Sequence, residues 1–427
     1  MRHTFWIATG ACALAVLAGC GKPSPAPAPQ AEQQSGPWLG DPVTVPSPAA
    51  PGARFPNLAA TGEASITVMS WLEPAGTDGS FRLRYSQWQD GRWGDPVEVA
   101  SGKDWFINWA DFPSVMPATS GAWAAHWLQQ KPGGVYAYDV SVSLSADAGR
   151  TWSTPRTPHD DGTATEHGFV SLAQVDGKPY AVWLDGRATA DEGHSHGDGS
   201  EHSEHGGAAG AMTVRGAVLQ ADGATAGAEI DGRVCDCCQT DVATTSDALV
   251  LVYRDRSDDE TRDIHAARLV DGAWSAPVAV HADGWRIDAC PVNGPAIAAR
   301  GDTVAVAWFT APDVSRVRLA WSKDGGRTFA APIEVANGKV VGRVDVVVLE
   351  DGRAVVSWLA EGPQGAVIRA QPFTGKGPAA PAMDIASTNI ARSSGFPQMV
   401  RVPGGLLFAW TATGTEPAVV TALAPLP

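Results

Sequence analysis

Four cysteines form the most distinctive chemical pattern in this sequence. Cys235, Cys237 and Cys238 are almost adjacent, and Cys290 follows further along the chain. Thiolates at this density suit soft or borderline metal ions such as Cu(I) or Zn(II). In an oxidising compartment such cysteines form disulfides, and we favour a bridge from Cys290 to one of the other three over metal binding. A copper or zinc ion is the one cofactor that the sequence suggests.

A histidine-rich stretch at residues 191–209 is a second place where a metal ion could bind. Its histidines are His194, His196, His202 and His205. Neutral imidazoles in a flexible loop can fold around a cation. We favour a solvated low-complexity loop with incidental metal affinity.

Charged and polar residues recur just before or just after apolar segments, and we interpret them as site candidates. The candidates for catalysis are Arg54, Asp111, Glu166, His167, Arg254, Asp255, Arg343 and Asp345. The candidates for ligand binding are Trp105, Asn108, Asp185, Arg187 and Asn293. A single charge of this kind is usually a solvated loop residue, so the interpretation depends on recurrence at matching positions of a repeat.

The N-terminal residues predict an exported lipoprotein. Arg2 precedes an apolar run from Phe5 to Leu17, and Ala18, Gly19 and Cys20 follow. The run is shorter than the ~18 to 20 residues that cross a bilayer as a helix, and it ends in a small-residue cleavage pattern. We expect residues 1–19 to be a signal peptide and Cys20 to carry the lipid anchor. An ordinary cleaved signal with a chance cysteine is the alternative.

Three further features indicate the location, the tether and the partners of the mature chain. Gly21 after the lipidated cysteine resembles the default sorting to the outer membrane of Gram-negative cells, with the protein facing the periplasm or the surface. Residues 20–37 are rich in proline and alanine, which predicts an extended tether. The formal net charge of −15 argues against nucleic acid or anionic lipid as the main partner.

Residues 38–427 are more than a usual single core holds unless the fold is a repeat architecture. An apolar segment ending in Val-x-Trp or a near variant recurs about every 50 to 56 residues, with one longer step of 70 residues. Its aromatic residues are Trp71, Trp127, Trp183, Tyr253, Trp308, Trp358 and Trp410. Further short apolar runs, commonly joined by Asp-Gly turns, give about four strands per repeat.

This pattern predicts an all-β propeller, in which each blade buries its faces against its neighbours. We favour seven blades, with six as the alternative, and place the histidine-rich stretch as an insertion in the third. The last blade has only three strands of its own, which end near Leu426. We therefore expect the segment from Trp38 to Val45 to supply its fourth strand and close the ring.

Two turns resemble the Asp box of sialidases and related propellers. They are Ser145-Ala-Asp-Ala-Gly-Arg-Thr-Trp152 and Ser322-Lys-Asp-Gly-Gly-Arg-Thr-Phe329. In this motif Ser and Asp bond the backbone of the turn, Gly takes a positive φ, and the aromatic ring packs between sheets. The motif therefore indicates the fold rather than an activity. Sialidases have six blades, so a seventh blade would be a departure from that family.

The resemblance also implies roles for some of the site candidates. In sialidases three arginines clamp the carboxylate of the substrate, an Asp is the acid/base, and a Tyr activated by a Glu is the nucleophile. Arg54-Phe55-Pro56 resembles the Arg-Ile-Pro site of that family. By blade position, Arg254 and Arg343 would complete the clamp, Asp111 would be the acid/base, and Glu166 would activate the nucleophile. No Tyr stands in a recognisable nucleophile motif, and we interpret Tyr253 as a core aromatic.

We expect a ligand pocket at the face of the central channel, lined by Arg54, Asp111, His167, Asp255, Cys290 and Asp345. The expected protein is a membrane-anchored, sialidase-like propeller that binds an acidic glycan or another small acidic ligand. If it is an enzyme, we expect a glycoside hydrolase of the exo-α-sialidase type. The alternative is a non-catalytic propeller that handles a ligand, copper or zinc through the cysteines and the histidine-rich loop.

Overall fold

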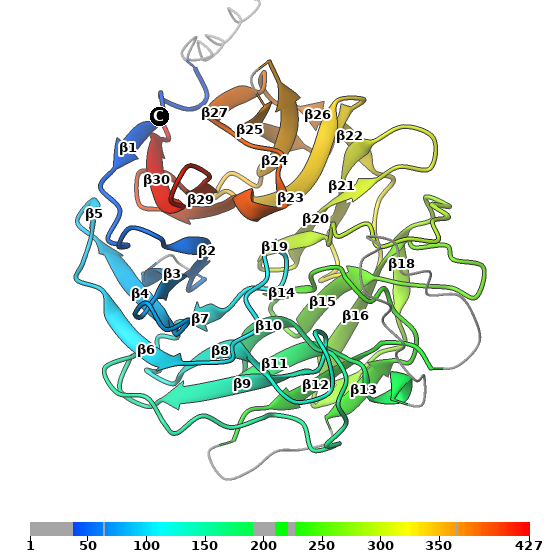
Figure 1. Ribbon diagram of the computed structural model, residues 1–427. Coiled ribbons are helices and arrows are strands. Elements are labelled where there is room, and N and C mark those ends of the chain that lie inside the picture. Colours follow the sequence, from blue (N-terminus) through cyan, green and yellow to red (C-terminus); the bar gives the residue numbers. More distant parts are fainter. Residues whose placement is uncertain (1–36, 63–64, 191–209, 221–226, 364) are drawn as a thin grey trace, which may run out of the picture. The chain divides into compact units, whose positions relative to one another are not determined.

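The computed structural model describes residues 37–427 apart from 63–64, 191–209, 221–226 and 364. The predicted signal peptide, Cys20, nearly all of the tether and the histidine-rich stretch lie outside the described residues. Within Trp38–Pro427, seven antiparallel sheets surround a common axis (Figure 1). None of the described helices has the length and apolar character needed to cross a bilayer. The prediction of an all-β propeller with seven blades is confirmed.

The innermost strands of the blades form a closed ring, because each contacts the innermost strands of the two neighbouring blades. These strands are β2 (Arg54–Ala60), β7 (Ser114–Met116), β10 (His167–Val175), β14 (Asp241–Thr244), β19 (Ala296–Arg300), β23 (Val340–Val348) and β28 (Gln398–Val402). Loops that lead into these strands therefore meet around the axis.

The second and third strands of every blade form antiparallel pairs further from the axis. The second strands are β3 (Thr67–Pro74), β8 (Trp123–Gln130), β11 (Lys178–Asp185), β15 (Leu249–Arg254), β20 (Thr303–Thr310), β24 (Ala354–Gly362) and β29 (Gly405–Ala412). The third strands are β4 (Phe81–Gln89), β9 (Tyr138–Ser145), β12 (Thr213–Val218), β16 (Ile264–Val270), β21 (Arg316–Ser322), β25 (Gly365–Thr374) and β30 (Ala418–Pro425).

Outer strands complete six of the blades. They are β6 (Val97–Gly102), β13 (Ala228–Asp231), β18 (Val278–His281), β22 (Ile333–Asn337), β27 (Met383–Thr388) and β1 (Val43–Val45). In the second blade, Arg156 takes this place through two backbone hydrogen bonds to Val142, of 2.7 and 2.9 Å. Short pieces complete the described secondary structure: β5 (Arg92–Trp93), β17 (Ala273–Trp274), β26 (Gly377–Pro378) and the 3-10 turns η1 (Arg187–Thr189) and η2 (Arg392–Ser394).

The N-terminal strand closes the ring as predicted. β1 pairs with β30 so that Val43 lies opposite Leu423 and Thr44 opposite Ala422. Leu39, just before β1, is fully buried in the core between the last two blades. This pairing covers the outer edge of β30 and holds the two ends of the described propeller in one sheet.

The core lies between the blades rather than at the centre. The seven repeated aromatic residues all fall in second strands, where alternate side chains point to the two faces of the sheet. Trp71, Trp183 and Trp308 have no exposed surface. One apolar cluster, for example, joins Trp321 of the fifth blade to Trp358 of the sixth. The repeat therefore supplies one large buried side chain to each layer between blades.

Both Asp boxes have the predicted turn chemistry. In the first, Ser145 Oγ accepts a 2.9 Å hydrogen bond from the Gly149 N–H, and Asp147 Oδ1 accepts one of 2.9 Å from the Thr151 N–H. Gly149 has φ 83°, a conformation that favours glycine. The box that begins at Ser322 repeats these bonds at Gly326 and Thr328.

Candidate functional site

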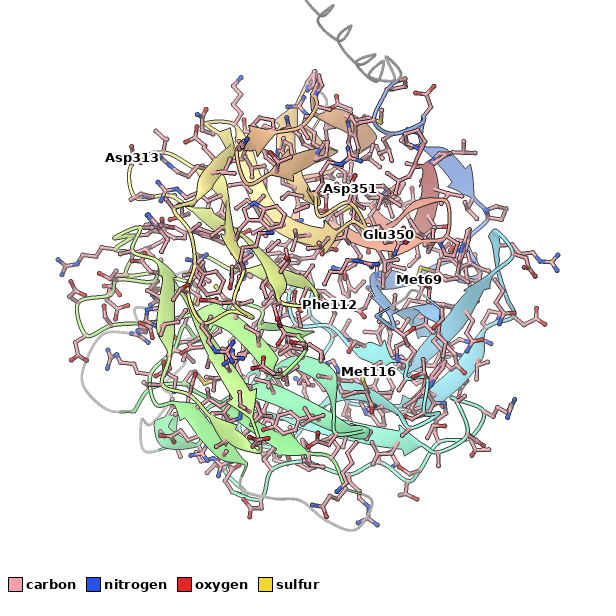
Figure 2. All side chains as sticks on the ribbon, turned by 180° about the vertical axis from the view of Figure 1, so that it is seen from behind. Met69, Phe112, Met116, Asp313, Glu350 and Asp351 are labelled. Carbon is pink, nitrogen blue, oxygen red and sulfur yellow. The ribbon has the colours of Figure 1, made fainter. Side chains whose placement is uncertain are left out.

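The seven innermost strands enclose a central cavity of about 410 Å³. Figure 2 shows Phe112, one of its lining residues, near the middle of the ring, and Asp313 at the outer edge. Two of the six predicted pocket residues, Asp111 and Asp345, line this cavity. The other four, Arg54, His167, Asp255 and Cys290, lie outside its wall as the structure describes it. The single pocket expected from the sequence is therefore not formed by all six residues.

Three buried aspartates connect alternate pairs of innermost strands. Each carboxylate accepts a hydrogen bond from a backbone N–H of the following blade. These bonds join Phe169 N to Asp111 Oδ1 at 2.8 Å, Ile297 N to Asp241 Oδ2 at 2.8 Å and Met399 N to Asp345 Oδ2 at 2.6 Å. Burial raises the pKa of all three carboxyl groups to about 7. Their first role is to hold the inner ring together.

The raised pKa values predict that the protein loses stability as the pH rises. An ordinary Asp ionises near pH ~4, so between about pH 4 and 7 the unfolded chain releases a proton that folded Asp241 retains. The free energy of unfolding should therefore fall by about 1.4 kcal/mol per pH unit for each such carboxyl group. The stabilisation is complete below pH ~4 and is lost as the pH passes through about 7.

We expect Asp241→Asn to flatten this profile, because the amide does not ionise. Urea unfolding of the wild type and the variant across this pH range would measure the difference in slope. Asp95→Asn, at an exposed position, is the matched control. Equal slopes for Asp241→Asn and the wild type would contradict the prediction.

One tyrosine hydroxyl connects two of the predicted catalytic carboxyl groups. Tyr138, in β9, donates to Glu166 Oε1 over 2.6 Å and lies 3.1 Å from Asp111 Oδ2. Its ring stacks on Phe106 with 4.1 Å between centroids and has no exposed surface. The structure thus brings Asp111 and Glu166 together, as the sequence predicts, through a tyrosine that the sequence analysis did not select.

The electrostatics of this group favour protonated carboxyl groups at neutral pH. Burial, together with the negative charges of Asp111, Asp236 and Cys290, raises the pKa of Glu166 to about 8. Burial and the two neighbouring carboxylates hold the pKa of Tyr138 well above its ordinary value. One of the two carboxyl groups can therefore be an acid while the other is a base.

Arg254 makes its hydrogen bonds with the backbone. It is 1% exposed, at the end of β15. Its guanidinium donates to the carbonyl oxygens of Arg262 at 2.6 Å, Phe309 at 2.7 Å and Asn293 at 2.8 Å. Its charge also lies 4.9 Å from the ring centre of Trp285. The predicted clamp role stays a prediction, and these bonds do not favour it.

Arg343 has the same kind of surroundings. It donates to Ser394 Oγ at 2.7 Å and to carbonyl oxygens that include that of Gly395 at 2.8 Å. The ring of Trp109 lies 4.8 Å from its guanidinium, and burial lowers its pKa to about 10. Asn293 Oδ1 accepts the Arg343 N–H at 2.8 Å. These contacts hold the loops around the channel together.

Arg54 lies apart from these two arginines. Its Nε donates to the Gly52 carbonyl at 3.3 Å, and its guanidinium is 5.5 Å from the ring centre of Phe81 in β4. Arg54, Arg254 and Arg343 bond to different groups of the described chain, and these bonds do not bring the three guanidinium groups to one ligand position.

Three predicted residues, His167, Asp185 and Arg187, lie in one buried polar cluster. His167 Nε2 is 3.1 Å from Asp161 Oδ2 and 3.7 Å from Asp185 Oδ1, and Arg187 Nε donates to Asp185 at 2.7 Å. The ring of His159 stacks on that of His167 at 3.9 Å and 8°. An imidazole nitrogen binds a metal ion in the plane of its ring, so these parallel rings do not suit one shared ion. We interpret the cluster as a set of charge pairs.

The remaining candidates support the loops. Trp105 stacks on Trp127 at 5.4 Å and is 8% exposed. Asn108 Oδ1 accepts the N–H groups of Ala110 and Asp111 at 2.8 and 3.3 Å, which fixes the loop that carries Asp111.

Asp255 belongs to a separate group on the fourth blade. It lies 3.6 Å from His265 Nδ1, and burial raises its pKa. Tyr253, two residues before it, donates to Asp231 at 2.6 Å and is 1% exposed, as expected of a core aromatic.

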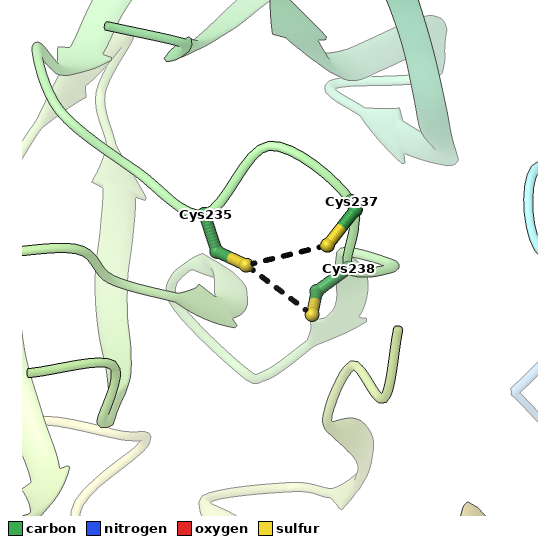
Figure 3. Close-up of side chains that lie close together, drawn as sticks. All are labelled: Cys235, Cys237 and Cys238. Carbon is green, nitrogen blue, oxygen red and sulfur yellow. Dashed lines mark hydrogen bonds between the residues drawn. The ribbon is translucent and has the colours of Figure 1, made fainter. Parts of the chain in front are cut away.

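The four cysteines gather at the channel side of the fourth and fifth blades. Cys235 Sγ lies 3.8 Å from Cys237 Sγ and 3.4 Å from Cys238 Sγ (Figure 3). The thiols of Cys237 and Cys290 are close enough to influence each other's pKa. All four are free thiols. Cys235, Cys237 and Cys238 form one group, Cys290 lies beside Cys237, and the predicted disulfide stays a prediction.

Sequence reasoning missed two residues of the site. Asp241 stands directly before a valine in an innermost strand, as Asp345 does, so the same criterion would have found it. Tyr138 had no such signal, because it lies in a third strand with the alternating burial of an ordinary core position. Its hydroxyl reaches the carboxyl groups only because the second and third blades meet there.

These features define the class of protein as a seven-bladed β-propeller with a carboxyl and thiol site beside the channel. No protein-family model and no curated protein sequence matches the chain. A protein of unknown function from Dyadobacter fermentans superposes with a TM-score of 0.52 at 15% identity, over 92% of this chain and 100% of that one.

Two glycosidases are more distant in structure. The α-L-arabinofuranosidase Arb93A from Fusarium graminearum has a TM-score of 0.49 at 14% identity, over 91% of this chain and 98% of that one. The NanB sialidase from Streptococcus pneumoniae has a TM-score of 0.44 at 9% identity, over 84% and 83%. At these identities the similarity concerns the fold alone. The β-propeller fold with Asp-box turns, which the resemblance to sialidases implied, is confirmed by the seven sheets and by the turn bonds at Ser145 and Ser322.

Proposed function

We propose that the protein binds a small glycan at the channel face and hydrolyses a glycosidic bond with Asp111 and Glu166. The observation that carries this proposal is the shared hydroxyl of Tyr138, which lies 2.6 Å from Glu166 Oε1 and 3.1 Å from Asp111 Oδ2. Glycoside hydrolysis needs two carboxyl groups, one as acid and one as nucleophile or base. Asp111 is buried and lines the central cavity, and Glu166 is half-buried.

The spacing of the carboxyl groups favours retention of configuration. Both carboxyl oxygens lie within 3.1 Å of one hydroxyl oxygen, so they are closer to each other than the ~6.5 to 9.5 Å typical of inverting glycosidases. A water molecule does not fit between them as it would in an inverting site. We therefore propose that one carboxylate of the pair, rather than a water molecule, attacks the sugar first.

The arginines favour a neutral glycan over the acidic ligand expected from the sequence. A carboxylate ligand needs guanidinium donors that are free to bind it. Arg254 and Arg343 donate to groups of the protein instead. Arg256 and Arg262, near the cysteines, both donate to Glu260.

We further propose that the lipid on Cys20 holds the protein in the cell envelope, where glycans of the wall and surface are present. This part of the proposal is supported by the lipobox at Leu17–Cys20 alone. Membrane attachment would keep the propeller within reach of such substrates through the tether at residues 20–37.

The test is a panel of fluorogenic glycosides with the purified mature protein. The panel holds sialosides together with neutral furanosides and pyranosides, and the anomer first released is identified by NMR. We expect release from a neutral glycoside with retained configuration. Release from sialosides alone would contradict the neutral class. No release from any glycoside, together with no binding on a glycan array, would overturn the proposal.

A further inference from the structure

The four cysteines come from two neighbouring blades and meet in space. Cys235, Cys237 and Cys238 lie in the loop before β14, and Cys290 lies in the loop before β19. β14 and β19 are adjacent in the inner ring. The Cys235 N–H donates to the Arg254 carbonyl at 3.0 Å, so one end of the group is fixed to β15. The arrangement is thus set by the fold and not by one flexible loop.

The sulfur separations fit a shared metal ion. In a tetrahedral zinc site with Zn–S bonds of ~2.3 Å, neighbouring sulfurs lie ~3.8 Å apart. The measured separations from Cys235 Sγ are 3.8 and 3.4 Å. The ligand atoms of the first three cysteines all lie within 4.8 Å of one another, and Cys290 lies beside Cys237, close enough to influence its pKa. A disulfide has sulfurs only ~2.05 Å apart and joins two residues, so it does not explain the convergence of Cys235, Cys237 and Cys238.

The charges around the sulfurs suit a thiolate site. Arg262 Nη1 lies 3.3 Å from Cys235 Sγ, and its guanidinium is held by Glu260 at 2.7 Å. The positive charge of Arg254 acts on Cys238. Four thiolates around a divalent ion leave a net charge of about −2, which the nearby Arg254 and Arg262 offset in part.

Burial gives the site one protected side and one open side. Cys235 and Cys238 are 1% and 2% exposed, whereas Cys290 is exposed. Cys237 is half-buried, so the exposure of the thiols increases from Cys235 and Cys238 to Cys290. A bound ion would therefore be shielded from water on the side of Cys235 and Cys238.

We propose that Cys235, Cys237, Cys238 and Cys290 together bind one thiophilic metal ion, Zn²⁺ or Cu⁺. Both are closed-shell ions that accept four or three thiolate ligands. The metal site and the carboxyl pair share no residue. They are close enough for the charge of Cys290 to raise the pKa of Glu166. Metal binding at this place would link the fourth blade to the fifth at the channel face.

The experiment measures metal on the intact mature protein, purified under reducing conditions without a chelator. Elemental analysis should find close to one equivalent of zinc or copper per chain. After removal of the metal, titration with Zn²⁺ and with Cu⁺ in separate arms identifies the preferred ion. Co²⁺ is the spectroscopic probe, because tetrahedral thiolate coordination gives a charge-transfer band and strong visible absorption.

The decisive variant is Cys290→Ser, because the exposed position leaves the core intact. It should weaken binding of the preferred ion by at least about 100-fold and change the Co²⁺ spectrum. Asp288→Asn, also exposed and two residues away, is the matched control and should bind like the wild type. Circular dichroism confirms that both variants fold.

Two outcomes would overturn the proposal. The first is equal metal binding by the wild type and Cys290→Ser. The second is a folded wild type that contains no metal and binds none after reduction. If the wild type binds no metal, counting free thiols on denatured, unreduced protein shows whether disulfides are the cause. Two disulfides among the four cysteines would leave none of these thiols free. Either result would leave the glycosidase proposal unaffected, because that proposal rests on Asp111, Glu166 and Tyr138.

Discussion

Replacing Glu166 by glutamine should lower kcat about 10²- to 10⁴-fold on the best glycoside of the panel, with little change in KM. The amide keeps the shape of the side chain and can still accept the Tyr138 hydroxyl, but it can neither donate nor take up a proton at the reacting bond. In the wild type, burial raises the pKa of Glu166 to about 8, so the group is mostly protonated at neutral pH. If Glu166 is the acid, kcat should fall as the pH rises through about 8.

The pH profile separates a catalytic role from a structural one. In Glu166→Gln, the fall of kcat near pH 8 should disappear. In Tyr138→Phe, the fall should remain but occur at a different pH, because Tyr138 is a positioning residue that contacts both carboxyl groups. Glu361→Gln, at an exposed position on the sixth blade, is the matched control. Full activity of Glu166→Gln with an unchanged profile would exclude Glu166 as acid or base.

The fold could be predicted from the sequence because its signals are local and repeated. A buried aromatic at the same place in each second strand sets the blade count, as Trp71 and Trp308 show. The turn bonds of Ser145 and Asp147 need only a few adjacent residues. The closure by β1 was also predictable, because its Gly-Asp-Pro-Val pattern at Gly40–Val43 matches the outer strand of another blade.

The site could be predicted only in part, because its contacts join residues of different blades. Asp111 and Glu166 were found from their positions before innermost strands. Tyr138 was not, since its sequence context matches any buried strand residue. The arginines show the opposite difficulty: a charge beside the channel suggests a ligand, but Arg254 and Arg343 bind backbone carbonyl groups left free by irregular loops. Sequence position does not reveal which partner a guanidinium takes.

Because Arg254 binds backbone carbonyl groups, its loss should have a large effect on stability. Arg254→Met should lower the free energy of unfolding by about 3 to 5 kcal/mol. Methionine fills a similar volume, but the carbonyl oxygens of Arg262, Asn293 and Phe309 lose a charged donor in a buried place. Each buried acceptor left unpaired costs about 1 to 3 kcal/mol.

Urea unfolding followed by circular dichroism measures this loss, and Arg286→Met, at an exposed position, is the matched control. A clamp for an acidic ligand would give the reverse pattern, since its removal would raise KM for an anionic glycoside and leave stability nearly unchanged. Arg254 links the end of β15 to carbonyl groups on both sides of the boundary between the fourth and fifth blades. A stability loss under about 1 kcal/mol would mean that this link is not structural, and the acidic ligand would again be the better interpretation.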